Sequence, residues 1–150
     1  MFLCKMKANV LQRSSIVRYD GSYGTLAAFR LSPARPTDRE STEVRGTGDV
    51  LFHEGEDLTL TYREEEGVSV KVEKTGNRLT ITRGGAVLAF LFGGVTEFTY
   101  RTSYGTLPTE ALCEELALQK RGATALLTLT YLAVVGGMAQ RNTVRFKITY

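Results

Sequence analysis

Apolar and polar residues alternate along most of the chain from residue 57 onward. In the run 57–64 (D-L-T-L-T-Y-R-E), Leu58, Leu60 and Tyr62 alternate with polar residues. Alternation with a period of two places successive side chains on opposite faces of a β-strand. The same pattern predicts strands over 68–73, 79–82, 97–101, 127–131 and 143–150, with Val144, Phe146, Ile148 and Tyr150 on one face of the last run.

Glycine-containing turns separate these runs at intervals of about ten residues. Glycine readily adopts the positive φ angles that tight hairpins need. Short, evenly spaced strands with one polar face are typical of an antiparallel meander that closes on itself. We therefore predict an all-β fold, a single antiparallel barrel of about eight to ten strands, with residues 1–150 forming one domain.

Three segments lack a clear alternation. The run 86–92 is apolar throughout, so we expect both of its faces to be covered, by the N-terminal segment. Residues 109–120 favour a helix by propensity, although strands are predicted on either side. In the first third of the chain we expect strands over 4–11, 24–31 and 42–52, and a loop over 32–41 that contains Pro33 and Pro36.

Composition excludes several functional classes. A hydrophobic content of 43% and a charged content of 23% are those of a globular protein. A net charge of +3 is too small to indicate nucleic-acid binding, and the run 86–92 is too short to span a membrane. Two cysteines and no signal peptide indicate free thiols in a reducing compartment, so we expect a cytoplasmic protein.

No catalytic constellation or metal-binding spacing is visible. His53 is the single histidine, and we interpret it as an exposed residue at a strand end. Cys4 and Cys113 do not combine with it into a zinc-binding pattern. The acidic triplet 64–66 reads as a solvated turn. We therefore expect no enzyme activity, no cofactor and no metal. An enzyme is the least favoured hypothesis, because it would need a perturbed acid or base and Glu64 is the single candidate.

One geometric prediction follows from the meander. If consecutive strands alternate in direction, the strand ends at Glu64, Arg83 and Thr102 lie at the same mouth of the barrel. By parity, each of these residues continues an inward-facing row. If the strand over 124–134 runs in the same direction, these rows also bring Tyr62, Tyr100 and Tyr131 into the same half of the interior. Glu64 and Arg83 then either pair with each other or hold the polar group of a ligand.

Several short motifs follow one another from Gly46 onward. They are L-T-L-T-Y-R-E at 58–64, T-R-G-G at 82–85, F-x-x-G at 90–93, Y-R-T-S-Y-G at 100–105 and T-L-T-Y at 128–131. With these motifs the chain resembles the YwiB-like family, bacterial proteins of unknown function with a calycin-like (lipocalin-like) β-barrel. The resemblance covers about two thirds of the chain and departs from the family in residues 13–45. It implies that residues 109–120 are largely a strand, and it implies no activity.

Two functional hypotheses remain open. In the first, the barrel binds a small molecule through Tyr62, Glu64, Arg83, Tyr100, Thr102 and Tyr131, above an apolar floor. In the second, the chain is a structural or protein-interaction module, such as a homodimer, without a ligand. Neither hypothesis involves nucleic acid or a membrane.

Overall fold

The computed structural model describes residues 4–32, 34–103 and 105–150, and of Thr102 only the backbone. Within these residues the chain forms ten strands and one short helix. Strands account for most of the chain, as the alternating pattern predicts. The elements are β1 (Met6–Tyr19), α1 (Leu26–Leu31), β2 (Pro36–Phe52), β3 (Leu58–Glu64), β4 (Ser69–Thr75), β5 (Arg78–Arg83), β6 (Ala86–Leu91), β7 (Val95–Thr102), β8 (Gly105–Arg121), β9 (Thr124–Val135) and β10 (Met138–Thr149).

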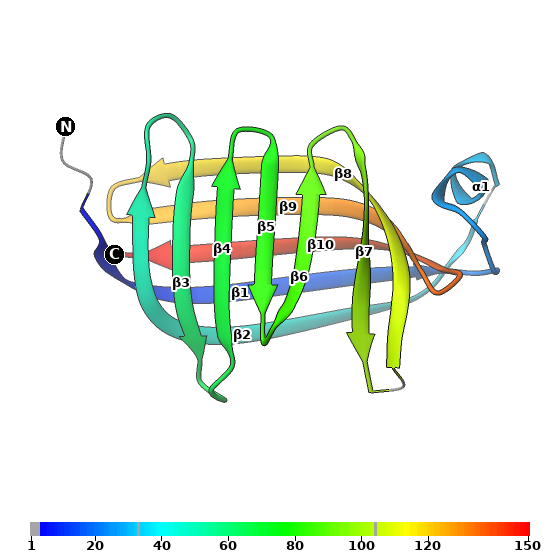
Figure 1. The fold of residues 1–150 in the computed structure, drawn as a ribbon, viewed down its shortest axis with the longest axis horizontal. Helices are drawn as coiled ribbons and strands as arrows, with labels where there is room; N and C mark the ends of the chain where they lie inside the picture. Colours follow the sequence, from blue (N-terminus) through cyan, green and yellow to red (C-terminus); the bar gives the residue numbers. More distant parts are fainter. Residues whose placement is uncertain (1–3, 33, 104) are drawn as a thin grey trace.

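The described strands form one antiparallel sheet in the order β6-β5-β4-β3-β2-β1-β10-β9-β8-β7. Figure 1 shows two layers: the short strands β3 to β7 lie in front, and the long strands β1, β9 and β10 cross behind them at a steep angle. The two layers are parts of the same sheet, which curls into a nearly closed barrel. The all-β, calycin-like barrel predicted from the sequence is confirmed.

Strands β2 and β8 bend from one layer into the other and form the corners (Figure 1). In β2 the bend is made by inward-facing glycines. A Cβ atom on Gly48 would lie 2.0 Å from the Thr61 carbonyl oxygen, and one on Gly46 would lie 2.7 Å from the Tyr62 ring. No side chain fits there, so glycine allows β2 to lie close against β3.

In β8 the corner coincides with a β-bulge, where the register with β9 shifts between Cys113 and Glu115. The inward row therefore changes parity: Ala111 and Cys113 precede the bulge, and Leu116 follows it. This shift hides the alternation and produces the helix-like spacing of residues 109–120. The strand implied by the family resemblance is confirmed, and the helical propensity is overridden by pairing on both sides.

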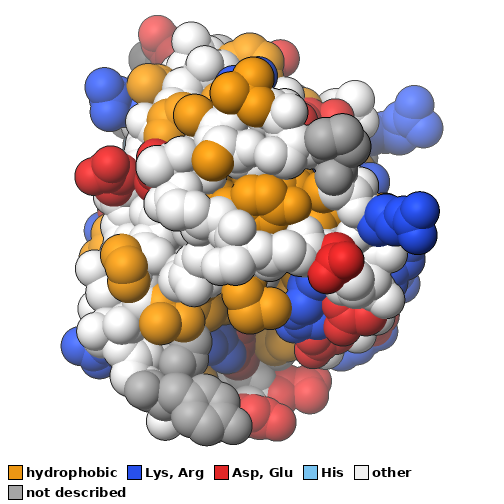
Figure 2. Space-filling model, turned by 90° about the vertical axis from the view of Figure 1, so that its right-hand side faces the viewer, with side chains coloured by type: hydrophobic (Ala, Val, Ile, Leu, Met, Phe, Trp, Pro, Cys, Tyr) orange, Lys and Arg blue, Asp and Glu red, His pale blue; other side chains and the backbone are white. Residues whose placement is uncertain are grey.

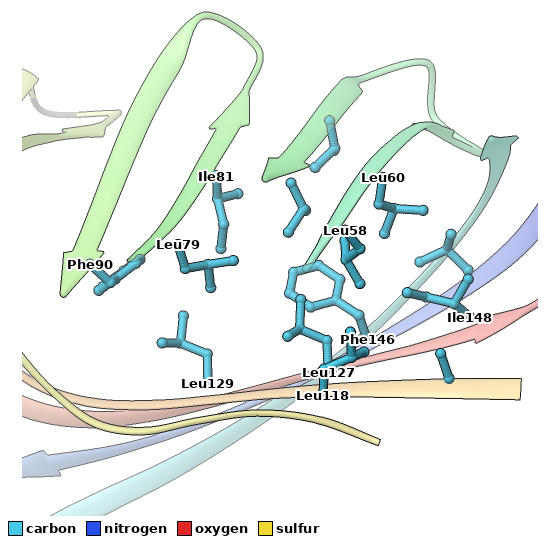
Figure 3. Close-up of a cluster of buried hydrophobic side chains, with 14 of the residues drawn as sticks. Leu58, Leu60, Leu79, Ile81, Phe90, Leu118, Leu127, Leu129, Phe146 and Ile148 are labelled. Carbon is cyan, nitrogen blue, oxygen red and sulfur yellow. The ribbon is translucent and has the colours of Figure 1, made fainter. Parts of the chain in front are cut away.

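The core fills the space between the two layers. In Figure 3, Leu58, Leu60 and Leu79 from the short strands meet Leu127, Phe146 and Ile148 from the long strands behind them. These six side chains are almost completely buried. Each lies on the inward row of its strand, so the alternation in the sequence corresponds directly to the core.

A second, smaller cluster lies outside the barrel, where α1 covers the outer face of β9. Thr25 caps the helix by accepting the amide hydrogen of Ala28, and Leu26 and Phe29 pack on Leu132 and Val134. Seen from this side, hydrophobic side chains reach the surface only as separate spots between polar atoms (Figure 2).

The N-terminal third departs from the predictions. Residues 24–31 were expected to form a strand and instead contain α1, because the Thr25 cap and the spacing of Leu26 and Phe29 suit one turn of helix against a sheet. The predicted loop over 32–41 is wrong from Pro36 onward, where β2 begins, and Pro33 lies outside the described residues. β1 also continues to Tyr19, well beyond the predicted end at residue 11.

The expectation that both faces of residues 86–92 are covered is wrong as well. Residues Ala86–Leu91 form β6, one edge of the sheet, and Val87 on its outer face is 49% exposed. In the described residues no backbone ladder joins β6 to β7. The seam is held instead by the Thr96 hydroxyl, which donates to the Ala89 carbonyl at 2.6 Å, and by packing of the Phe90 and Phe98 rings, whose centroids are 5.5 Å apart.

Candidate functional site

The interior contains a cavity of about 250 Å³ at one side of the barrel. Its floor is formed by apolar side chains such as Leu129 and Phe146, and its other walls are mainly polar, with Ile16 and Val44 among them. The polarity of the inward-facing side chains changes along single strands. On β10 the inward row begins with the polar Gln140 and Asn142, continues with Val144 and ends with Phe146 and Ile148.

We call the polar end of the interior the polar half and the packed end the apolar half. The polar half consists of the polar residues that line the cavity: Gln12, Ser14, Thr42, Glu64, Arg83, Tyr100, Tyr131, Gln140 and Asn142. The apolar half consists of buried residues that do not line it: Val50, Leu58, Leu60, Val72, Leu79, Leu118, Leu127 and Ile148.

Glu64 and Arg83 form a bidentate ion pair at the mouth of the cavity. Arg83 Nε donates to Glu64 Oε2 at 3.1 Å, and Nη2 donates to Oε1 at 2.7 Å. Glu64 is only 4% exposed, whereas the Arg83 side chain is 52% exposed. The carboxylate is therefore enclosed, and the guanidinium covers it from the solvent side. The hydrogen bond to Glu64 is the main factor that raises the pKa of Arg83.

The three predicted tyrosines have different surroundings. Tyr62 is buried, and its hydroxyl donates to Gln12 Oε1 at 2.9 Å, so it supports the wall without lining the cavity. Tyr131 lines the cavity, and burial raises its pKa above the usual range. Tyr100 also lines the cavity and is 37% exposed.

Five of the six predicted site residues are thus placed at one end of the interior. The ends of β3, β5 and β7 share one edge of the front layer (Figure 1), as the strand directions predict. The side chain of Thr102 lies outside the described residues. β9 has the direction that the prediction required, because β9 and β7 are both antiparallel to β8. It lies in the rear layer and crosses the short strands, so Tyr131 reaches the cavity from the opposite wall.

Sequence reasoning missed the amide and hydroxyl groups of the long strands. Gln12, Ser14, Thr42, Gln140 and Asn142 all line the cavity. Gln12 Nε2 donates to Ser14 Oγ at 3.1 Å, and Gln140 Nε2 donates to Asn142 Oδ1 at 3.2 Å. A sign in the sequence was the run 12–15, which is polar at every position. In the structure this run still pairs with β10 on one side and β2 on the other.

Other chemically interesting residues stay apart from the cavity mouth. His53 is half-buried, and its Nε2 lies 2.9 Å from the Thr59 hydroxyl oxygen. Cys113 is buried, which raises the pKa of its thiol to about 11, and Cys4 is exposed. Among the described residues, no group of three or more His, Cys, Asp or Glu side chains is placed to hold a metal ion. No helix in the described part of the chain is long and apolar enough to cross a membrane.

Comparison with known proteins is consistent with this fold. The chain matches a crystal structure of the ywiB protein from Bacillus subtilis with a TM-score of 0.64 and 16% sequence identity, over 97% of this chain and 94% of that chain. No curated protein matches the sequence. The model of a domain of unknown function, DUF1934, matches residues 33–145. The chain therefore belongs to the DUF1934 family, in agreement with the YwiB-like resemblance.

Proposed function

We propose that this protein binds a small molecule inside the barrel and has no catalytic role. The observation that carries the proposal is the 250 Å³ cavity, which has an apolar floor and a wall of amide, hydroxyl and charged groups. Apolar depth combined with a few converging polar groups is the general form of a small-molecule site. At about 30 Å³ per molecule, roughly eight waters would fill this volume, so the ligand is the size of a fragment.

The polar residues supply a physical argument against a purely structural interior. A row of inward-facing amides and hydroxyls on central strands stabilises a fold less than apolar packing does. Ser14 and Asn142 nevertheless occupy inward positions on two central, paired strands of the sheet, β1 and β10. Recognition of a polar ligand group gives these residues a role that core packing does not.

A test is a fragment screen followed by NMR amide shifts. Phenyl-containing and short alkyl fragments with different head groups are expected to shift the amide signals of cavity residues. In Ser14→Phe, the new ring occupies the cavity, and the shifts should be lost. Ser15→Phe is the matched control, because Ser15 is the next residue on β1 and its side chain is on the outer face.

Loss of binding in Ser14→Phe and its retention in Ser15→Phe would support the proposal. Both variants must first give the dispersed amide spectrum of a folded β-protein. If no fragment produces shifts that depend on Ser14, the proposed function is wrong.

A second candidate function is self-association through the seam between β6 and β7, and exposed apolar residues favour it. Val87, Phe92 and Val95 lie on or next to the two sheet edges and are 49%, 47% and 51% exposed. Exposed edge strands are common sites of pairing between chains. A dimer in light scattering that is lost in Val87→Lys would favour this candidate, and a monomer at high concentration would eliminate it.

A further inference from the structure

The mouth of the cavity offers one ligand chemistry more readily than others. We infer that the ligand is a small organic acid: an apolar body on the cavity floor and a carboxylate held by the free edge of the Arg83 guanidinium. This inference rests on the proposed function and specifies the head group of its ligand.

The Arg83 guanidinium has N–H donors that Glu64 does not use. Arginine carries five N–H donors in a planar fork. In the described structure its hydrogen bonds, from Nε and one N–H of Nη2, both go to Glu64. The remaining edge, formed by Nη1 and the second N–H of Nη2, has the bidentate geometry that matches a carboxylate. Arg83 lines the cavity and is half exposed, so this edge is accessible from the mouth.

Glu64 fixes the orientation of this fork. A bidentate contact from a buried carboxylate holds the guanidinium plane in place, which reduces the conformational entropy lost on binding. Glu64 itself is a poor partner for a cationic ligand, because both of its oxygens already accept from Arg83 and the group is 4% exposed. The accessible charge at the mouth is therefore positive.

The neighbouring phenols add neutral donors. Burial raises the pKa of Tyr131, so its phenol stays protonated at neutral pH. A side-chain hydrogen bond with Asn142 opposes part of this shift in the Tyr131 pKa. Tyr100 lines the same cavity as Arg83 and Tyr131. The lining that contains Arg83 therefore also contains neutral phenols, which can donate to a carboxylate.

The floor below the mouth suits an apolar body. It consists of aliphatic and aromatic side chains on strands from both layers. They are Val70, Ile81, Leu88, Phe90, Leu129, Val144 and Phe146.

The experiment compares probes that share a body and differ in head group. Phenylacetate, phenylacetamide and phenethylamine are titrated by NMR into the full chain, together with hexanoate and hexanamide. We expect the carboxylates to bind about tenfold more tightly than the amides, the effect of roughly one charge-assisted hydrogen bond. The amine should bind most weakly.

Variants then assign the preference to Arg83. The double variant Glu64→Gln/Arg83→Gln removes both charges, so no buried carboxylate is left unpaired, and it should reduce the acid-to-amide ratio to about one. Glu64→Gln alone should strengthen acid binding several-fold, because the positive charge is no longer balanced. Arg78→Gln is the control, since Arg78 is exposed at the opposite end of the same strand.

The outcomes separate this inference from the function on which it rests. If amides or the amine bind as tightly as the acids and Ser14→Phe still abolishes binding, the organic-acid inference is overturned and the proposed function stands. An acid preference that survives in the double variant also overturns the inference. If no probe shows binding that depends on Ser14, both are overturned.

Discussion

The two halves of the barrel interior are built from the same strands but differ in packing. On β9, Leu127 and Leu129 are both completely buried and face the interior two residues apart. Leu127 belongs to the apolar half and has no contact with the cavity, whereas Leu129 forms part of the cavity floor. One alternating row therefore crosses from a filled region into a hollow one.

This difference shows how stability and binding can be divided within one small barrel. The apolar half has the close packing that stabilises protein cores. The polar half contains space and hydrogen-bonding groups, which contribute less to stability. Tyr62 stands at the boundary: its ring lies against Gly46, and its hydroxyl donates to Gln12.

The largest expected effect comes from truncating the two leucines. Leu127→Ala should reduce the free energy of unfolding by about 4 kcal/mol, because it opens a new cavity in a filled region. Leu129→Ala should cost about 1 kcal/mol less, because Leu129 already lacks neighbours on its cavity side. Urea denaturation of both variants measures the difference. Equal losses would contradict the distinction between the halves.

A smaller loss is expected at the corner that closes the apolar half. Gly48→Ala places a methyl group against the Thr61 carbonyl oxygen, and we expect a loss of about 1–3 kcal/mol from backbone displacement. Gly24→Ala is the control, because a Cβ atom there meets nothing within 4 Å and no positive φ is required. Similar melting temperatures for the two variants would show that β2 can move away from β3.

At the boundary, Tyr62→Phe removes the hydrogen bond to Gln12 and keeps the ring. We expect a loss of about 1 kcal/mol, typical for one partly buried hydrogen bond. The amide signals of Gln12 and Ser14 should shift, while those of the apolar half stay in place. Amide shifts of similar size in both halves would contradict this prediction, because the loss of the Tyr62 hydroxyl would then affect the whole interior.

The smallest effect concerns the cysteines and appears only at alkaline pH. The Cys113 pKa of about 11 lies above its ordinary value of 9.0, so the buried neutral thiol contributes stability below about pH 9 that is lost as the pH rises through 11. A thiol reagent at about pH 8 should modify exposed Cys4 rapidly and Cys113 only after unfolding, because the thiolate is the reactive form. Equally rapid modification of both thiols would contradict the burial of Cys113.

The apolar half could be predicted from the sequence because its residues alternate strictly. Leu58, Leu60 and Phe146 were placed on inward rows by period alone, and the structure buries them. The position of Glu64 and Arg83 at the same mouth followed from strand direction and parity, and pairing with each other was one of two alternatives. The structure shows that they pair. Their role in binding stays a prediction.

The amides of the polar half and the hydroxyls of Ser14 and Thr42 could not be predicted, because polar residues on both strand faces resemble a loop. Gln12 and Ser14 face a hollow interior and Arg13 faces solvent, so β1 shows no alternation there. Helix α1 was missed for a related reason: its two buried residues, Leu26 and Phe29, pack on the outside of the barrel. A pattern that separates inside from outside cannot recognise a second apolar cluster on the outer face.

The bulge in β8 has a consequence for changes in chain length. Glu114 is the extra residue there, and its carboxylate binds Arg141 on the outer face. Deleting Glu114 would leave Cys113 and Leu116 facing inward, because only the unpaired position is lost. Deleting Leu112 instead would turn the residues between it and the bulge to the wrong face. Deletion of Glu114 therefore leaves the other residues of β8 on the same faces of the sheet as before.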